Sequence, residues 1–248
     1  CVENDGTVVL GLRHSVPDEP KTENIELDMG AGGVDVKIDG VGPPSGDSVE
    51  MASRNLVIDE SDFVVRFDAR TKQWTAAWKW TDDRQPEALK NCVAEYSIKR
   101  EAKEEYEKEI GVWMERGWLR RYDESKHGKP KGLIPLMAVV QKNKAKVRPV
   151  LDFRELNEHI QPFTANADVC AEKMRQWRKK GSNVALLDLT KAYLQIAMEE
   201  ELWPYQTVMH EGERLCLTRL GFGLNVAPVI MLAVLEAVLK QDPLVYAG

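Results

Sequence analysis

The apolar residues of this chain occur in short runs separated by turn residues and charged residues, and this limits what the chain can fold into. The longest run, from Ala227 to Leu239, is shorter than the ~18 apolar residues that a membrane span needs. Hydrophobic residues still make up 43% of the 248 residues, which is enough for a packed core. We therefore expect a core of short strands and helices, and no helix that crosses a membrane.

The spacing of the apolar residues assigns these runs to strands or helices. Alternating apolar residues around turns predict three β-hairpins. They lie at residues 63–80, 134–151 and 206–218. Helical spacing predicts amphipathic helices over 96–116 and 167–180, each followed by glycine. Pro228 favours the start of a last, buried helix, and residues 184–187 are typical of a buried strand. Hairpins that alternate irregularly with helices indicate an α+β fold.

The beginning of the chain differs in composition from the rest. Residues 1–95 hold 10 Lys and Arg against 19 Asp and Glu, whereas residues 96–248 hold 24 against 21. The stretch from Met29 to Ser48 is rich in Gly, Pro and Asp and has few bulky side chains, as is typical of poorly ordered segments. The expected parts are an acidic, partly disordered leader (1–57), a β-hairpin and linker (58–95) and a larger domain (96–248).

The cysteines and the first residue indicate a compartment and a context. Cys1, Cys92, Cys170 and Cys216 lie far apart and form no CxxC pair. This spacing argues against a zinc knuckle or a disulfide framework and favours a reducing compartment. The chain opens without an initiator Met or a signal peptide, so we expect a piece of a longer cytoplasmic polypeptide.

Asp188 follows the predicted buried strand, where a carboxylate is unfavourable unless it is paired or binds a cation. Taken alone, it is better explained as a helix cap or a hydrogen-bonded turn, because Thr190 and Lys191 follow it. Three sequence blocks favour a second interpretation. The blocks are VRPVLDFRELN (147–157), LDLTKAYLQI (187–196), which contains Asp188, and TRLGFGLNVAP (218–228).

In order and spacing, these blocks resemble the fingers motif, the first palm aspartate motif and the Phe-Gly-Leu…Ala-Pro motif of reverse transcriptases from retroviruses and LTR retrotransposons. The resemblance extends from about residue 96 to residue 248. It implies an RNA-directed DNA polymerase, a nucleotidyltransferase, of which this chain carries the fingers and a partial palm of the right-hand fold. The family's Tyr-x-Asp-Asp turn, which supplies two further carboxylates, does not occur here. We therefore expect this chain to be inactive alone.

The resemblance also implies a two-metal site. In the family, two Mg²⁺ ions, which Mn²⁺ can replace, stabilise the attacking and leaving oxygens as a primer is extended by a dNTP. By resemblance, Asp188 is the catalytic carboxylate that bridges both ions. The main-chain carbonyl of Leu189 helps to bind the ion on the nucleotide side.

The implied nucleotide pocket takes residues from all three blocks and the preceding turn. The implied dNTP-binding residues are Lys142, Arg148, Ala192, Tyr193, Phe222 and Gly223. Lys142 and Arg148 match the cations that hold the triphosphate, although another lysine of the 141–146 stretch could take the place of Lys142. Tyr193 matches the ring beneath the deoxyribose that excludes a 2′-hydroxyl, and a core tyrosine is the alternative. Phe222 and Gly223 match the pocket floor, where glycine lets the backbone approach closely.

Two further features have more than one interpretation. Asp152 and Arg154 fall where the family contacts the template strand, and a salt bridge that holds the fingers is an equal alternative. Seven basic residues and no acidic one lie between Lys126 and Arg148, which indicates either a nucleic-acid surface or an ordinary solvated face. Lys191 stands where retroviral enzymes often carry an acidic residue.

These observations predict template-directed DNA synthesis from RNA or DNA. The expected partners are RNA or DNA template–primer, dNTPs and the rest of a pol polyprotein (remaining palm, thumb and RNase H), in retroelement particles and without a membrane. A non-catalytic nucleic-acid-binding relic of a decayed retroelement is the alternative from another class. An RNA-dependent RNA polymerase is the alternative among polymerases, and the bulky Tyr193 argues against it.

Overall fold

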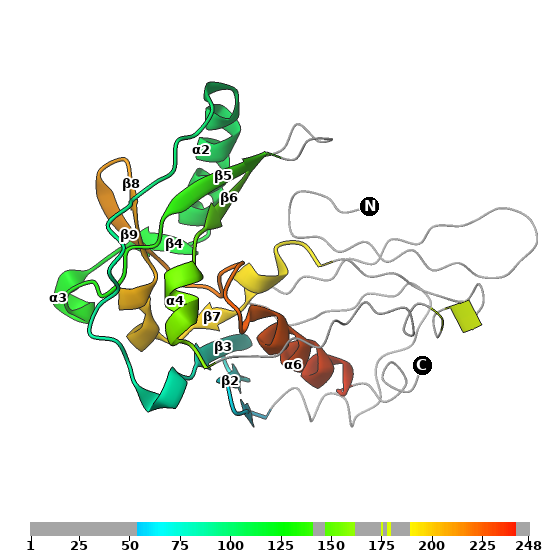
Figure 1. Cartoon of the computed structure of the whole chain (residues 1–248). Helices are drawn as coiled ribbons and strands as arrows, with labels where there is room; N and C mark the ends of the chain where they lie inside the picture. Colours follow the sequence, from blue (N-terminus) through cyan, green and yellow to red (C-terminus); the bar gives the residue numbers. More distant parts are fainter. Residues whose placement is uncertain (1–53, 141–146, 162–174, 176–177, 180–188, 242–248) are drawn as a thin grey trace, which may run out of the picture.

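The computed structural model describes residues 54–140, 147–161, 175, 178–179 and 189–241, which Figure 1 shows in colour. Strands and helices are mixed in these residues, which confirms the α+β class. The lysine-rich turn at 141–146, the predicted strand at 184–187 and nearly all of the leader lie outside the described residues. The same holds for all but three residues of the predicted helix at 167–180.

The predicted hairpin at 63–80 is confirmed and belongs to a four-stranded sheet in the order β1-β2-β3-β7. Its strands are β1 (Leu56–Asp59), β2 (Phe63–Asp68), β3 (Gln73–Trp78) and β7 (Ala197–Met198). Neighbouring strands are antiparallel except for β3 and β7, which pair in parallel. Phe63 and Val65 pair with Trp78 and Ala76, and all four are buried. The sheet therefore connects the hairpin to a strand that directly follows the second sequence block.

A three-stranded antiparallel sheet in the order β4-β9-β8 confirms the predicted hairpin at 206–218. Its strands are β4 (Leu119–Arg121), β8 (Thr207–His210) and β9 (Glu213–Leu217). Glu211 and Gly212 form the hairpin turn with φ angles of 48° and 80°. Positive φ at both central residues suits the right-handed twist of a two-residue hairpin.

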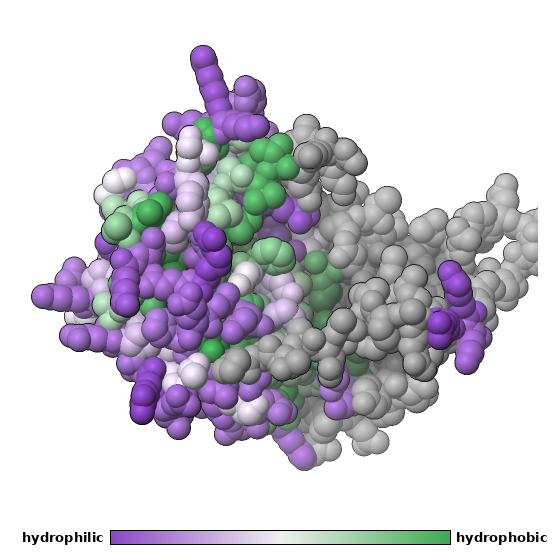
Figure 2. All heavy atoms as spheres, in the orientation of Figure 1, coloured by the Kyte–Doolittle hydropathy of each residue, from purple (hydrophilic) through white to green (hydrophobic). Residues whose placement is uncertain are grey.

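The hairpin predicted at 134–151 is confirmed as well. It consists of β5 (Leu136–Val140) and β6 (Val147–Leu151), which pair in antiparallel register. Figure 2 shows an apolar strip over this hairpin, where the side chains of Val139 and Val140 are 43% and 50% exposed. Figure 1 shows the hairpin beside the helix that precedes it in the sequence.

That helix, α2 (Arg100–Glu115), confirms the prediction at 96–116 but begins later. The backbone N–H of Tyr96 donates to the carbonyl of Leu136 in β5, so the segment before α2 is extended and cannot also be helical. The buried face of α2 is formed by Ala102, Tyr106, Ile110 and Trp113. Gly117, with a φ angle of 66°, ends the helix in the conformation that glycine favours.

The last helix, α6 (Ala227–Leu239), carries Pro228 in its first turn as predicted. It is buried on one side only, which corrects the expectation of a buried helix. It packs against β2 and against η2 (Ala192–Gln195), a 3₁₀ helix, whereas Leu232 and Leu239 are each 42% exposed. The remaining short helices are η1 (Thr81–Asp83), α3 (Glu124–His127), α4 (Arg154–His159) and η3 (Glu200–Tyr205).

The core is one continuous hydrophobic cluster to which all three sheets contribute. Its largest fully buried side chains include Tyr106 of α2, Tyr205 of η3 and Phe153, which directly precedes α4. Within the part of the chain that the structure describes, no helix is both long and apolar enough to cross a bilayer. The core therefore holds the three sequence blocks and the β1–β3 sheet in one folded unit.

Candidate nucleotide and template site

The structure describes eight of the ten residues that sequence analysis assigned to the site. These are Arg148, Asp152, Arg154, Leu189, Ala192, Tyr193, Phe222 and Gly223. Asp188 and Lys142 lie outside the described residues, so the two-metal site remains a prediction.

Arg148 lies on the solvent side of β6. Alternate residues Val147, Pro149 and Leu151 of this strand are buried, so Arg148 is exposed because of its place in the alternation. Its backbone lies opposite Val139 of β5. No hydrogen bond or ion pair of its side chain is found within the described residues. Within the described residues, nothing therefore keeps the guanidinium from a phosphate ligand.

Asp152 and Arg154 form a salt bridge directly after β6. Arg154 donates from Nε to the two carboxylate oxygens of Asp152 at 2.8 and 3.0 Å, and from Nη2 at 2.5 Å. The Tyr96 hydroxyl donates to the same carboxylate at 3.0 Å. Hydrogen bonding from Arg154 is the main cause that lowers the pKa of Asp152 to about 2. The structure thus shows the salt bridge that sequence analysis left open, while the template contact remains a prediction.

The salt bridge leaves one of its members accessible. The Asp152 side chain is 8% exposed, whereas that of Arg154 is 81% exposed. Asp152 holds the guanidinium from one side, and the other side faces solvent. A positioned and exposed arginine remains able to bind an anionic strand.

The loop Gly221–Asn225 packs tightly against the first block. A Cβ atom on Gly221 would come within 2.3 Å of the Phe153 ring, so only glycine fits there. Asn157 of α4 donates from Nδ2 to the carbonyl of Gly223 at 2.9 Å, and its Oδ1 accepts from the N–H of Asn225 at 2.9 Å. Gly223 has a φ angle of 105°, which L side chains rarely adopt. The first and third blocks therefore meet at this loop.

The second block meets the same loop through an aromatic contact. The rings of Tyr193 in η2 and Phe222 have centroids 5.8 Å apart and are tilted by 44°. Phe222 is 65% exposed, while Tyr193 is half-buried and burial raises its pKa. Leu189 and Ala192 are also half-buried and pack against the core. Tyr193 thus contacts both the core and the exposed ring, and its place beneath a deoxyribose remains a prediction.

Lys191 has a structural role that sequence analysis did not predict. Its ammonium forms an ion pair of 2.6 Å with Glu109 of α2 and lies 5.5 Å from the centre of the Trp118 ring. Glu109 also accepts a hydrogen bond from Nε1 of Trp113 at 3.0 Å. Lys191 therefore ties the second block to α2. No local pattern signals a pair so far apart in sequence.

Two of the basic residues between Lys126 and Arg148 have partners within the protein. Lys126 forms an ion pair of 2.7 Å with Glu200, and Lys131 lies over the Tyr205 ring with its ammonium 5.3 Å from the ring centre. For these two, the contacts are compatible with an ordinary solvated face, and the nucleic-acid surface remains a prediction. Arg148 is exposed, and the lysines at 142, 144 and 146 lie outside the described residues.

Comparison with known proteins gives similarity to solved structures alone. No protein-family model matches the chain, and no curated protein matches it. The native protease–reverse transcriptase of prototype foamy virus is 21% identical, with a TM-score of 0.48 over 64% of this chain and 20% of that chain. A foamy viral protease–reverse transcriptase solved in complex with double-stranded DNA is 18% identical, with a TM-score of 0.46 over 64% of this chain and 29% of that chain. This chain therefore spans less than a third of the length of these structures.

Proposed function

We propose that this chain forms the fingers and part of the palm of an RNA-directed DNA polymerase within a longer retroelement polyprotein. The reaction is nucleotidyl transfer, in which the primer 3′-hydroxyl attacks the α-phosphorus of a dNTP and pyrophosphate leaves. The observation that carries the proposal is the convergence of three separate sequence blocks on the loop Gly221–Asn225.

Convergence matters because motif order alone does not bring residues together. A polymerase must grip the triphosphate, the sugar and the template at once, and it does so with residues from several rigid elements. Here Phe153 and Asn157 hold the loop from one side, and Tyr193 contacts it from another. This arrangement supports a shared site for the three blocks.

In the proposed nucleotide pocket, residues from all three sequence blocks contact the dNTP. Arg148, with Lys142, binds the triphosphate. Tyr193, preceded by Ala192, lies beneath the deoxyribose and blocks a 2′-hydroxyl. Phe222 and Gly223 form the floor of the pocket. Phe222 suits this role because it is exposed although it is aromatic, and Gly223 because its backbone carries no side chain toward a ligand.

The remaining roles concern the metals and the template. Asp188 and the carbonyl of Leu189 would hold the Mg²⁺ ions, which stabilise the attacking and leaving oxygens when bound. Arg154 contacts the template backbone, and Asp152 acts as its positioning residue through the hydrogen bonds described above. In this way the salt bridge serves the template contact instead of replacing it.

A primer-extension assay tests the proposal. The enzyme is the polypeptide that continues this reading frame through a Tyr-x-Asp-Asp turn, supplied with an RNA template, a DNA primer, dNTPs and Mg²⁺. We expect extension that Asp188→Asn abolishes. The matched control, Asp83→Asn in the exposed turn η1, should extend like the parent.

The same assay decides between the proposal and its alternative. A polypeptide that binds primer–template but extends it with neither Mg²⁺ nor Mn²⁺ is a non-catalytic nucleic-acid-binding relic. Extension that survives Asp188→Asn would show that our placement of the metal site is wrong.

A further inference from the structure

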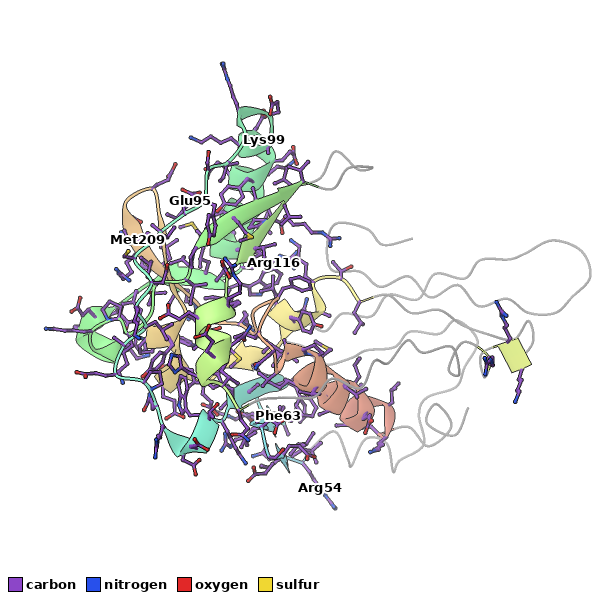
Figure 3. The ribbon with its side chains drawn as sticks, viewed as in Figure 1. Arg54, Phe63, Glu95, Lys99, Arg116 and Met209 are labelled. Carbon is purple, nitrogen blue, oxygen red and sulfur yellow. The ribbon has the colours of Figure 1, made fainter. Side chains whose placement is uncertain are left out.

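A cavity of about 410 Å³ lies on the side of the molecule that carries Glu95 and Met209 in Figure 3. Its walls are the extended segment before α2, the face of α2 with Lys103 and Glu107, and the turn between β8 and β9. A neighbouring cavity of about 550 Å³ shares Glu107, His210 and Glu211 with it. These three side chains are therefore reached from two cavities, and none of them belongs to the proposed polymerase site.

The three side chains have the spacing of metal ligands. One potential ligand atom from each of Glu107, His210 and Glu211 lies within 4.8 Å of the other two. Nε2 of His210 and Oε2 of Glu107 are 3.1 Å apart. Tetrahedral bonds of about 2.0–2.1 Å place neighbouring ligands roughly 3.3 Å apart, so this pair already has a suitable separation. Glu211 lies in the exposed hairpin turn, where its side chain can move toward the other two.

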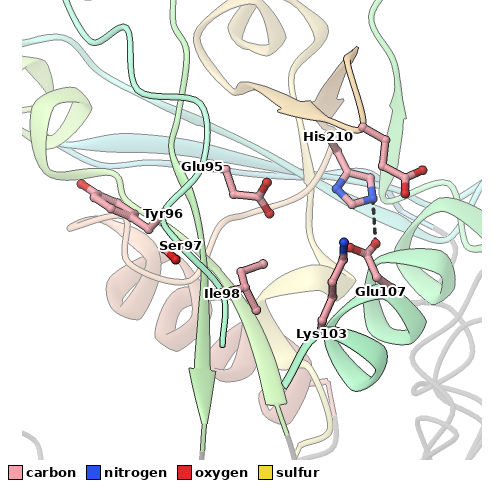
Figure 4. A pocket seen from close by; sticks show the side chains of 8 residues that line it. Glu95, Tyr96, Ser97, Ile98, Lys103, Glu107 and His210 are labelled. Atoms are coloured by element: carbon pink, nitrogen blue, oxygen red, sulfur yellow. Dashed lines mark ion pairs between the residues drawn. The ribbon is translucent and has the colours of Figure 1, made fainter. Parts of the chain in front are cut away.

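His210 supplies the observation that points to a ligand. Its side chain is only 9% exposed, and its Nδ1 has no hydrogen-bond partner within the described residues. In Figure 4, His210 extends into the cavity between Glu107 on one side and Glu95 on the other. If Nε2 binds a metal, Nδ1 carries the proton, and a carboxylate at Glu95 is the usual kind of acceptor for it. Metal binding would therefore give both ring nitrogens a role.

The charge around the cavity favours a cation. Glu95, Glu107 and Glu211 contribute carboxylates to the first cavity, where Lys103 is the one lysine or arginine. Arg121 lines the second cavity and is paired with Glu213. One imidazole with two carboxylates is a donor set for a borderline divalent metal, because Mg²⁺ and Ca²⁺ prefer oxygen ligands alone.

We propose that Glu107, His210 and Glu211 bind a divalent transition-metal ion of the zinc class, with Glu95 orienting His210. The site lies between α2 and the β8–β9 hairpin, which are far apart in sequence. It uses none of the residues assigned to the Mg²⁺ site of the proposed polymerase and does not depend on that function.

Calorimetric titration of the whole 248-residue chain with Zn²⁺ tests this site. We expect binding of one ion that His210→Gln and Glu211→Gln each weaken at least tenfold. Glu213→Gln, in the same hairpin but paired with Arg121, and His159→Gln, on α4, are the matched controls and should bind like the parent. Because Glu211 is exposed, its substitution should leave the far-ultraviolet circular dichroism unchanged.

Titration with Co²⁺ identifies the ligands. Nitrogen and oxygen ligands give weak visible absorption without the strong near-ultraviolet band of a cobalt–thiolate bond. That band, if lost in Cys92→Ser, would assign the ion to the exposed Cys92 and overturn the proposal. Absence of Zn²⁺ binding, or equal binding by His210→Gln, Glu211→Gln and the controls, would overturn it as well.

Discussion

The two sides of the loop Gly221–Asn225 differ in how much freedom the fold leaves them. On one side, Gly221 lies against the buried Phe153 ring and Asn157 forms hydrogen bonds to the backbone at both ends of the Gly223–Asn225 segment. On the other side, Phe222 is 65% exposed and contacts the half-buried Tyr193. A binding site needs this combination, because rigid support behind a surface keeps that surface in place for a ligand. Substitutions on the first side should destabilise the fold, and substitutions on the second should alter the selectivity of the site.

The largest effect on stability is expected from Gly221→Ala. The new Cβ would lie 2.3 and 2.5 Å from two atoms of the Phe153 ring, which is itself 2% exposed and has no room to move. Overpacking of this kind costs about 2–3 kcal/mol. For a domain of this size the loss lowers Tm by roughly 5–10 °C, which thermal unfolding followed by circular dichroism would measure.

Gly111→Ala is the control for that experiment. Gly111 lies within α2, and a Cβ there would meet no atom within 4 Å. Alanine has the higher helix propensity by up to about 1 kcal/mol, so this variant should be slightly more stable than the parent. If Gly221→Ala unfolds at the parent Tm, the loop is less tightly packed than the structure indicates.

On the exposed side of the loop, where Tyr193 contacts Phe222, a substitution should change the selection between rNTP and dNTP. In the longer polypeptide that completes the palm, Tyr193→Val should raise the rNTP:dNTP ratio of kcat/KM by roughly tenfold or more, because the ring that clashes with a 2′-hydroxyl is removed. The change should come mainly from a lower KM for the ribonucleotide. Tyr193→Phe keeps the ring and should retain the parent ratio. An unchanged ratio in Tyr193→Val would mean that Tyr193 is only a packing residue.

The amino-acid sequence predicted most of the local secondary structure correctly. The hairpins, α2 and the start of α6 follow from apolar spacing and from turn residues, which act over a few residues. The late start of α2 was missed because a hydrogen bond from Tyr96 to distant Leu136 overrides the helical pattern. The exposed side of α6 was missed because apolar composition does not show which faces find a partner.

In the candidate site, too, contacts between residues far apart in sequence could not be predicted from local patterns. The conjunction of Tyr193 and Phe222 was predictable only through the family resemblance, since no spacing rule brings residues 29 positions apart into contact. Asn157 lies within a recognised block, but its hydrogen bonds to Gly223 and Asn225 depend on tertiary structure. The cluster of Glu107, His210 and Glu211 has no sequence signal at all, because α2 and the β8–β9 hairpin meet only in the fold.

The three lysines between β5 and β6 are expected to contact the phosphates of a nucleic acid. If Lys142, Lys144 and Lys146 contact phosphates, replacing all three with Gln should reduce the slope of log affinity for primer–template against log salt by up to about 2.7. Fluorescence anisotropy over a salt series measures this slope. Lys126→Gln with Lys131→Gln is the control, because these lysines already interact with Glu200 and Tyr205. An equal slope in the triple variant would make the turn an ordinary solvated loop.

The smallest expected effect concerns the salt bridge beside the loop and depends on pH. Asp152 has a folded-state pKa of about 2, below its usual value of 3.8, mainly because Arg154 hydrogen-bonds to it. A lowered pKa means that the folded state favours the ionised carboxylate. Its contribution to stability is therefore complete above about pH 4 and is lost as the pH falls through about 2.

The size of that contribution is limited by solvent. A shift of this extent corresponds to roughly 2.5 kcal/mol at most, and the 81% exposure of Arg154 reduces it to about 1 kcal/mol through screening. Asp152→Asn should therefore lower the free energy of unfolding by about 1 kcal/mol at pH 7 and by much less at pH 2. Urea unfolding at both pH values measures the difference, with Asp83→Asn in the exposed η1 turn as the control. An equal loss at both pH values would mean that Asp152 stabilises the fold by packing and neutral hydrogen bonds, and that its charge does not hold Arg154 in place.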